Sequence, residues 1–399
     1  MVKLFIRIPI LLMAVVLVYF NIRLFHTQSY NADLGYDEDV YAQLQHLKTE
    51  LHQKNAAIKM QQFFPEGFIF INALYALTWC ELVDSNTDST IKKEAIEEVD
   101  WAISEILSEY AKSSFNEELP LKYGVFYRGW TNYVIAQRIN LGTTSSSLKQ
   151  LFKQNCDEIS EAYEKSESPY LESYYMAAWP ADNMLAVASL NLGEQILAGS
   201  HSPKSILPIW LEKVKKLLDD DGRIPHGVQW ETGKTIEASK GNSMSLMLCF
   251  LYDIDSSFAK SQFINYKENF LDERLGLPGI REHAKGLAGD GDIDSGPVIW
   301  EIGGAASIVG QRTMATYSEW NVYLGLRNSI EAFGAAYIWN GKKKYVFGQM
   351  PMADAFIAWS NVAAKESTIK TTSNWRWKFQ LGSAFVLLIF SLLGKISLK

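Results

Sequence analysis

Apolar and polar positions alternate along the chain in long blocks. Segments with apolar residues on one helical face are each followed by a segment that is apolar nearly all round. A helix apolar on every side is buried, whereas an amphipathic helix covers a core with one face. The apolar segments begin near residues 66, 126, 180, 239, 296 and 351, about 54 to 60 residues apart. Even spacing of this kind indicates a repeat architecture.

The repeat predicts an all-α fold of twelve helices arranged as six helical hairpins. An inner ring of six buried helices inside an outer ring of six amphipathic ones would satisfy the pattern, which is an (α/α)6 toroid. A linear helical solenoid is the alternative, but its repeats are usually shorter and its inner helices need not be so uniformly apolar. One interruption predicts a β-hairpin insertion, because a turn at Glu231–Lys234 separates residues 223–230 from the short run Thr235–Glu237. In a toroid, such an insertion would sit over the mouth of the ring.

Both ends of the chain are strongly apolar. Leu4 to Phe25 is followed by no small-residue cleavage site, which indicates an uncleaved signal anchor. The second run, Phe379 to Ile396, follows Trp and basic residues at 375–378, a composition typical of a membrane interface. Each run is near the lower length limit for crossing a bilayer, so interfacial or re-entrant placement is the alternative. We predict transmembrane helices at residues 1–28 and 371–399 that flank a toroid domain at residues 29–370.

Charge and composition narrow the compartment and the partners. Lys3 and Arg7 favour a cytoplasmic N-terminus, which would leave the body outside the cytoplasm. No Asn-x-Ser/Thr sequon occurs, as suits a bacterial envelope protein anchored in the cell membrane. The net charge of −7 and the scattered basic residues argue against nucleic acid as a partner. We expect a lipid bilayer and a glycan or small-molecule substrate as partners, and the pattern does not predict an oligomeric state.

An acidic, glycine-rich loop precedes the fifth apolar segment. Residues 286–297 read GLAGDGDIDSGP, with Asp290, Asp292 and Asp294 alternating with small or apolar residues. Like charges this close repel one another, so a fold keeps them on solvated surface or at a site that uses the charge. We expect Pro297 to open a helix directly after them.

The same loop has the spacing of a calcium site. With Glu301, the three aspartates occupy positions 1, 3, 5 and 12 of a calcium-binding loop, although Ser295 replaces the glycine required at position 6. We therefore expect no cofactor, with a calcium ion at Asp290, Asp292 and Asp294 as the alternative. The cysteines Cys80, Cys156 and Cys249 are far apart and lack metal-ligand spacing, which predicts buried thiols.

Polar groups mark the start of every inner helix, Glu66 at the first among them. In a toroid these starts would converge on one mouth, and paired carboxylates there suit general acid–base cleavage of a glycoside. The candidate catalytic residues are Asp292, Asp294, Asp290, Glu237, Asp182 and His226. The candidate substrate-binding residues are Tyr127, Arg128, Trp130, Trp179, Asn183, Trp230, Lys240 and Glu301. As alternatives, Asp182 and Asp294 would cap helices, Glu301 would be the second catalytic carboxylate, and Arg128 and Lys240 would pair with rim carboxylates.

Three motifs carry a family resemblance. WPADN at Trp179–Asn183, GRIPH at Gly222–His226 and GDGDIDSGP at Gly289–Pro297 resemble bacterial (α/α)6-toroid proteins of the linalool dehydratase/isomerase-domain type. That group is similar in architecture to toroid glycoside hydrolases and lyases, and the resemblance covers roughly residues 60–365. It implies the toroid fold and, as an activity, cofactor-free chemistry on a terpene alcohol at a site that includes cysteines. Here we expect the three cysteines to lie away from the mouth.

Three hypotheses of function follow from these patterns. The first is a membrane-anchored toroid enzyme that uses mouth carboxylates for general acid–base cleavage of a carbohydrate. The second is a hydro-lyase acting on a terpenoid alcohol. The third is a non-catalytic glycan-binding or envelope assembly protein.

Overall fold

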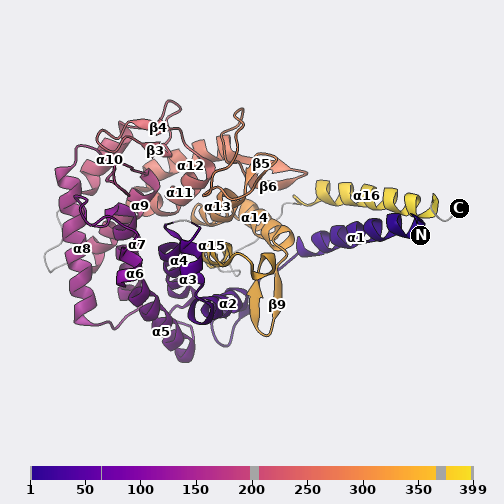
Figure 1. The fold of residues 1–399 in the computed structure, drawn as a ribbon, viewed down its shortest axis with the longest axis horizontal. Helices are drawn as coiled ribbons and strands as arrows, with labels where there is room; N and C mark the ends of the chain where they lie inside the picture. Colours follow the sequence, from indigo (N-terminus) through magenta and orange to yellow (C-terminus); the bar gives the residue numbers. More distant parts are fainter. Residues whose placement is uncertain (1, 64, 198–205, 365–373, 397–399) are drawn as a thin grey trace.

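The computed structural model describes residues 2–63, 65–197, 206–364 and 374–396, and it is mostly helical, as the all-α prediction requires. Six buried helices form the centre of the molecule (Figure 1). They are α4 (Gly67–Leu82), α7 (Gly124–Asn140), α9 (Pro180–Ile196), α11 (Gly241–Ile254), α13 (Gly304–Thr316) and α15 (Pro351–Asn361). Each packs against the next in this order, and α15 packs against α4, so the inner helices close a ring.

Amphipathic helices surround this ring. They are α2 (Glu38–Lys54), α5 (Ser89–Ile106), α8 (Ser146–Lys165), α10 (Leu207–Lys215), α12 (Ser256–Phe270) and α14 (Trp320–Phe333), with the short helices α3 (Ala56–Gln61) and α6 (Glu109–Lys112) between them. Side chains cap the N-termini of four outer helices, for example Ser145 for α8 and Asp255 for α12. In the part of the chain that the structure describes, no inner helix has a side-chain N-cap.

Five two-stranded antiparallel hairpins join the helices within the described residues. They are β1 (Tyr30–Asn31) with β2 (Tyr36–Asp37), β3 (Gly227–Val228) with β4 (Thr235–Glu237), β5 (Leu271–Arg274) with β6 (Leu277–Ile280), β7 (Val298–Ile299) with β8 (Ile302–Gly303), and β9 (Tyr337–Trp339) with β10 (Lys342–Lys344). A 3₁₀ turn, η1 (Val346–Gly348), leads from β10 towards α15. The β3–β4 pair confirms the hairpin predicted between residues 223 and 237.

The fifth inner helix starts later than predicted. Pro297 precedes the β7–β8 hairpin, and the helix begins only at Gly304. Trp300 and Glu301 form the turn with φ of 50° and 69°, in a left-handed region that a right-handed helix cannot use. Glu301 therefore lies on a hairpin turn and not one turn into a helix, which corrects that expectation.

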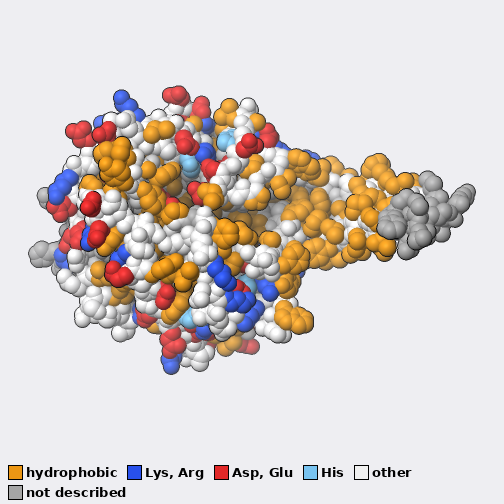
Figure 2. Space-filling view, in the orientation of Figure 1, with side chains coloured by type: hydrophobic (Ala, Val, Ile, Leu, Met, Phe, Trp, Pro, Cys, Tyr) orange, Lys and Arg blue, Asp and Glu red, His pale blue; other side chains and the backbone are white. Residues whose placement is uncertain are grey.

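Two apolar helices, α1 (Val2–Arg23) and α16 (Trp377–Ile396), pack against each other and project from the ring as an extension (Figure 1). Hydrophobic side chains cover most of its visible surface (Figure 2). Both segments that we expected to cross a membrane are thus helical. Within the residues that the structure describes, no helix combines the length and the apolar content that crossing a membrane requires.

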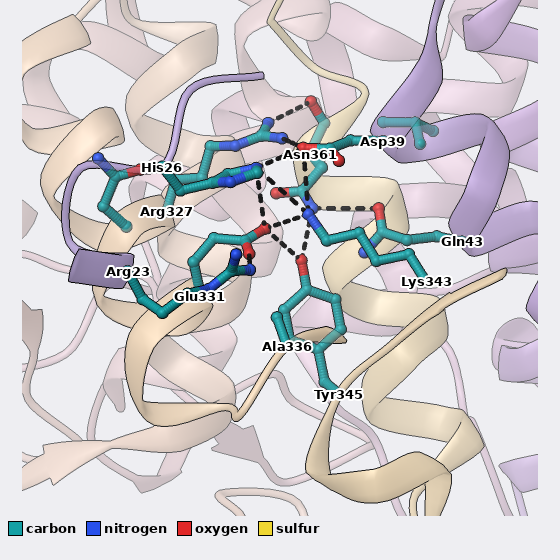
Figure 3. Close-up of polar contacts among 12 residues, drawn as sticks. Arg23, His26, Asp39, Gln43, Arg327, Glu331, Ala336, Lys343, Tyr345 and Asn361 are labelled. Atoms are coloured by element: carbon teal, nitrogen blue, oxygen red, sulfur yellow. Dashed lines mark hydrogen bonds and ion pairs between the residues drawn. The ribbon is translucent and has the colours of Figure 1, made fainter. Parts of the chain in front are cut away.

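A buried ionic cluster joins the extension to the ring (Figure 3). Arg23, at the end of α1, pairs with Glu331 of α14, and His26 Nε2 lies 2.5 Å from Asp39 Oδ2 on α2. Lys343 Nζ of β10 bridges both carboxylates, at 2.5 Å from Glu331 and 3.1 Å from Asp39. Burial opposes ionisation here, but the His26 hydrogen bond and the Lys343 charge hold the pKa of Asp39 below its usual range.

This cluster predicts a large loss of stability for Lys343→Met. The variant leaves Asp39 and Glu331 buried with less compensating charge, so we expect the free energy of unfolding to fall by about 3–5 kcal/mol in denaturant titrations of the full chain in detergent. Lys344→Met is the matched control, because Lys344 is partly exposed and lies over the Tyr337 ring, a contact worth about 0.5–1 kcal/mol. Equal losses from the two variants would contradict the role of the cluster.

Candidate active site at the mouth of the helical ring

Charged residues gather where the inner helices begin. Glu66 directly precedes α4, Asp182 lies in the first turn of α9, and Lys240 directly precedes α11. None of them caps its helix by a side-chain hydrogen bond. The N-cap position of α13 is Gly303, so Asp294 and Ser295 do not cap that helix either. The capping alternative is therefore wrong for Asp182 and Asp294, and their carboxylates need another explanation.

Asp182 and Asp294 form the proton-holding half of the mouth. Burial, together with the charges of Glu66 and Asp294, raises the pKa of Asp182 to about 7, against a 2.6 Å hydrogen bond from Ser173 Oγ that lowers it. Asp294 is exposed, yet desolvation by the surrounding protein and the charges of Glu66 and Asp292 raise its pKa to about 6. Tyr174 donates a hydrogen bond to Glu66, whose charge acts on both aspartates. Because these carboxyls act on one another, they lie within one electrostatic neighbourhood.

Asp292 and Glu237 form the ionised half. Lys240 Nζ lies 2.8 Å from Glu237 Oε2 and 3.0 Å from Asp292 Oδ2, and so joins the β3–β4 hairpin to the acidic loop. Burial alone would raise the pKa of Asp292, but hydrogen bonds from Ser295 and Lys240 outweigh it and lower that pKa to about 2. The Lys240 hydrogen bond likewise lowers the pKa of Glu237. Glu237 Oε1 has no described partner and the side chain is half exposed, so this oxygen is open to a ligand.

His226 lies beside this ionised half. Its Nδ1 forms a hydrogen bond with Ser243 Oγ, and its Nε2 is 3.8 Å from Glu237 Oε2. Burial and the Lys240 charge lower the pKa of His226 to about 4, so the imidazole is neutral near pH 7. A neutral ring held through one nitrogen can orient a neighbour or accept a proton only weakly.

The acidic loop is folded around Asp292. Oδ1 of Asp292 accepts hydrogen bonds from Ser295 Oγ at 2.7 Å and from the backbone N–H of Asp294 at 3.1 Å. Oε1 of the buried Glu282 lies 2.8 Å from the same Ser295 Oγ and competes with Asp292 for its single hydroxyl proton. Asp290 is exposed, and its charge is not among those that shift the pKa of Asp294. The loop therefore brings Asp292 and Asp294 into the mouth and leaves Asp290 at its edge.

Four predicted binding residues are used inside the fold. Arg128 is buried and donates to Asn155 and Glu158 on α8. The amide of Asn183 holds the backbone of Leu171. Tyr127 donates to the carbonyl of Ile106, and Trp130 is buried among the aromatic rings of the core. We leave these four side chains out of the candidate site.

The remaining predicted residues lie nearer the surface. Trp179 is half-buried beside Asp182, with its ring edge-on to Tyr174 at 6.0 Å. Trp230 is half-buried and packs on the core. Glu301 pairs with Arg274 at 2.9 Å and Arg281 at 2.7 Å, which satisfies its charge away from the mouth carboxylates.

Sequence reasoning missed several side chains of the mouth. Glu66 was noted at the start of the first inner helix but was not chosen as a candidate, although it follows a Phe-Pro pair and precedes an apolar run as Asp182 follows Trp-Pro. Ser173, Tyr174 and Glu282 lie in irregular segments whose sequence carries no periodic signal. Their positions depend on tertiary packing alone.

The cysteines and the possible metal ligands lie elsewhere. Cys80, Cys156 and Cys249 are all buried, which confirms that prediction, and burial raises the pKa of Cys156 and of Cys249 to about 11. Among the described residues, only His26, Asp39 and Glu331 bring three potential metal-ligating atoms within 4.8 Å of one another. Those carboxylates already pair with Lys343 and arginines. Calcium binding by the acidic loop stays a prediction.

The two halves of the mouth predict opposite pH dependence of stability. Unfolded aspartate has a pKa of about 3.9, so between that value and about 7 the folded chain holds a proton on Asp182 that the unfolded chain has lost. Stability therefore falls as pH rises through this window. Asp182→Asn keeps an acceptor for Ser173 and should raise the free energy of unfolding at pH 8 by up to about 3 kcal/mol, with little effect at pH 4.

Asp292→Asn is the matched comparison, since the folded pKa of Asp292 is lowered. Its ionised form contributes stability that is present above about pH 4 and is lost as pH falls towards 2. We expect this variant to be less stable than the unmodified chain at pH 8. Denaturant titrations at both pH values measure the two effects, and changes of the same sign at pH 8 would contradict the division of the mouth.

No protein-family model matches the chain, and no curated protein matches it significantly. The mouth combines two carboxyls with raised pKa values, Asp182 and Asp294, and two ionised ones, Glu237 and Asp292, that pair with Lys240.

Proposed function

We propose that the chain is an (α/α)6-toroid enzyme that cleaves a carbohydrate by general acid–base catalysis at the mouth of its ring. The observation that carries this proposal is the opposite displacement of carboxyl pKa values within one mouth: Asp294 and Asp182 upward, Glu237 and Asp292 downward. Glycoside cleavage needs one protonated and one ionised carboxyl at the same pH.

Asp294 is the proposed general acid. Its pKa of about 6 keeps it mostly protonated below that pH and about one-tenth protonated at pH 7, and its exposure lets a leaving glycosidic oxygen reach the proton. The like charges of Glu66 and Asp292 help to keep the proton on Asp294. Asp182 is held by a hydrogen bond from Ser173, and the charges of Glu66 and Asp294 help to raise its pKa in turn.

Glu237 is the proposed base. Lys240 keeps its carboxylate ionised, and its free Oε1 would accept a proton from the attacking water. Asp292 is a positioning residue, because its oxygens are taken up by Lys240, Ser295 and the loop backbone. The half-buried ring of Trp179 would suit a sugar ring, whereas Tyr174 stacks on Phe115 within the wall.

The ring architecture and the family resemblance support the proposed toroid enzyme. A closed ring of six inner helices with outer helices around it fits the (α/α)6 toroid and the resemblance to linalool dehydratase/isomerase-domain proteins. Terpenoid hydro-lyase chemistry receives no support from the cysteines, since all three are buried as protonated thiols.

We further propose that the α1–α16 extension inserts into a lipid bilayer and leaves the ring outside the cytoplasm. Leu11, Val15 and Phe385 are among the many apolar side chains that the extension exposes. Contiguous apolar surface of this extent is rare on proteins that meet only water, and it marks a lipid or protein contact.

Activity measurements on the full chain in lipid vesicles test the enzymatic proposal. Asp294→Asn and Glu237→Gln should each lower kcat roughly 10²–10⁴-fold on the glycan that is cleaved, as loss of a general acid or base does. The substrates are bacterial envelope glycans, and the readout is the release of reducing ends. Asp290→Asn is the matched control and should keep full activity, because Asp290 stands apart from the coupled carboxyls.

The pH profile adds a second readout. The rate should fall above about pH 6 as Asp294 loses its proton, and Asp294→Asn should flatten that limb. If all three variants cleave alike, or if no glycan is cleaved at any pH, the proposed chemistry is wrong.

A further inference from the structure

A belt of aromatic, apolar and cationic side chains surrounds the base of the extension. The β5–β6 hairpin and the β9–β10 hairpin lie near the point where α1 and α16 leave the ring (Figure 1). Both hairpins end in exposed apolar side chains, and neither takes part in the mouth. Their positions relative to the extension follow from contacts with its helices.

The β9–β10 hairpin stands beside α1. Tyr19 of α1 donates to the carbonyl of Ala336, at 3.3 Å, directly before β9 begins. Within the hairpin, Ile338 pairs with Lys343. The Lys343 ammonium belongs to the buried ionic cluster that joins the extension to the ring. Trp339, next to the turn, is 69% exposed and pairs across the hairpin with Lys342.

The β5–β6 hairpin reaches the start of α16. A Cβ at its turn residue Gly276 would lie 2.8 Å from the carbonyl oxygen of Trp375, so the turn contacts the segment that leads into the helix. Lys378 of α16 pairs with Glu273 of β5. Leu275, in the same turn, is 57% exposed.

Cations accompany these apolar tips. The Arg376 guanidinium lies 4.0 Å from the centre of the Trp375 ring, and Lys344 lies over Tyr337. Among the described residues, Lys342, Lys344 and Arg376 form no ion pair with a carboxylate, whereas Lys378 pairs with Glu273. Tryptophan and tyrosine beside lysine and arginine, at the level where apolar helices begin, is the composition of a membrane–water interface.

We propose that the two hairpin tips rest on the headgroups of an anionic phospholipid bilayer, so that the ring is seated on the membrane and not merely tethered to it. This inference rests on the proposed insertion of the extension. Trp339 and Leu275 enter the interfacial region on either side of the two helices, while Lys342, Lys344 and Arg376 attract the anionic lipids. The contacts of both hairpins with α1 and α16 fix the tilt of the ring relative to the bilayer.

Site-specific fluorescence on the full chain tests whether the two hairpin tips contact the lipid headgroups. The three native cysteines are buried, so one introduced cysteine takes a polarity-sensitive thiol label. Trp339→Cys and Leu275→Cys report the hairpin tips, and Val15→Cys reports the extension. Ile209→Cys on α10 is the matched control, since Ile209 is 58% exposed and belongs to the outer ring. The vesicles contain phosphatidylcholine and phosphatidylglycerol, with a nitroxide either on the headgroup or deep in the acyl chain.

We expect headgroup nitroxide to quench the labels at 339 and 275 and to leave the label at 209 bright, while deep nitroxide quenches the label at 15. If the labels at 339 and 275 stay as bright as the one at 209 while the label at 15 is quenched, the hairpin tips do not contact the headgroups, and the proposed insertion of the extension stands. If the label at 15 is also unquenched, the extension does not insert, and both proposals are wrong.

Two further measurements test whether the hairpin tips prefer anionic lipid and whether they contact a second copy of the chain instead. Lys342→Glu combined with Lys344→Glu should weaken headgroup quenching at 339 in vesicles with phosphatidylglycerol, and unchanged quenching would overturn the anionic specificity. A blue shift at 339 that depends on protein concentration in detergent, without vesicles, would instead assign this surface to a second copy of the chain. Circular dichroism of each variant confirms that it is folded.

Discussion

The contact between α15 and α4 is the constraint on which the rest of the structure depends. It turns a row of helical hairpins into a closed ring and brings together residues near the starts of α4, α9 and α11, with loops far apart in the chain. A carboxyl on any one of these segments would be an ordinary solvated group. Only closure places Glu66, Asp182, Glu237 and Asp294 around the same space, where water is partly excluded and like charges act on one another. At the outer helices α5, α8 and α12, the polar side chains at the N-termini are used as caps and so are not left for the mouth.

A shortage of cations then divides the mouth. Lys240 is shared by Glu237 and Asp292, and both ionise readily because its charge and its hydrogen bonds outweigh burial. The Ser173 hydroxyl donates a hydrogen bond to Asp182 and lowers its pKa against burial. At Asp294, Lys240 lowers the pKa less than the charges of Glu66 and Asp292 raise it. Two aspartates on one loop, separated by a single residue, therefore hold their protons at different pH. The cause is the position of two donors, the Ser295 hydroxyl and the Lys240 ammonium, whose hydrogen bonds lower the pKa of Asp292 and not that of Asp294.

The sequence predicted most of the ring and part of the mouth. Five of the six inner helices begin within a few residues of the predicted starts, because long apolar runs after Gly or Pro are strong signals. The fifth was misplaced: Pro297 suited either a helix or a strand, and strands of two residues are too short to alternate visibly. Asp182 and Lys240 were found from their places at helix starts, but Arg128 and Asn183 share that signal and face the outer helices instead. Which way a side chain points within the first turn depends on its neighbours, and a single sequence does not contain that information.

Closure of the ring also sets the order in which the chain can finish folding. The first elements meet the last: α1 packs on α16, α2 on β10 and α15, and α4 on α15. During synthesis, α4 emerges with apolar residues on every face, and one flank stays uncovered until α15 has been made, when most of the chain is already outside the ribosome. Contacts between such distant segments slow folding, because a long loop must close before they contribute any stability. The incomplete ring is thus the state in which this protein is most exposed to aggregation, and the one in which a chaperone would find an apolar surface to hold.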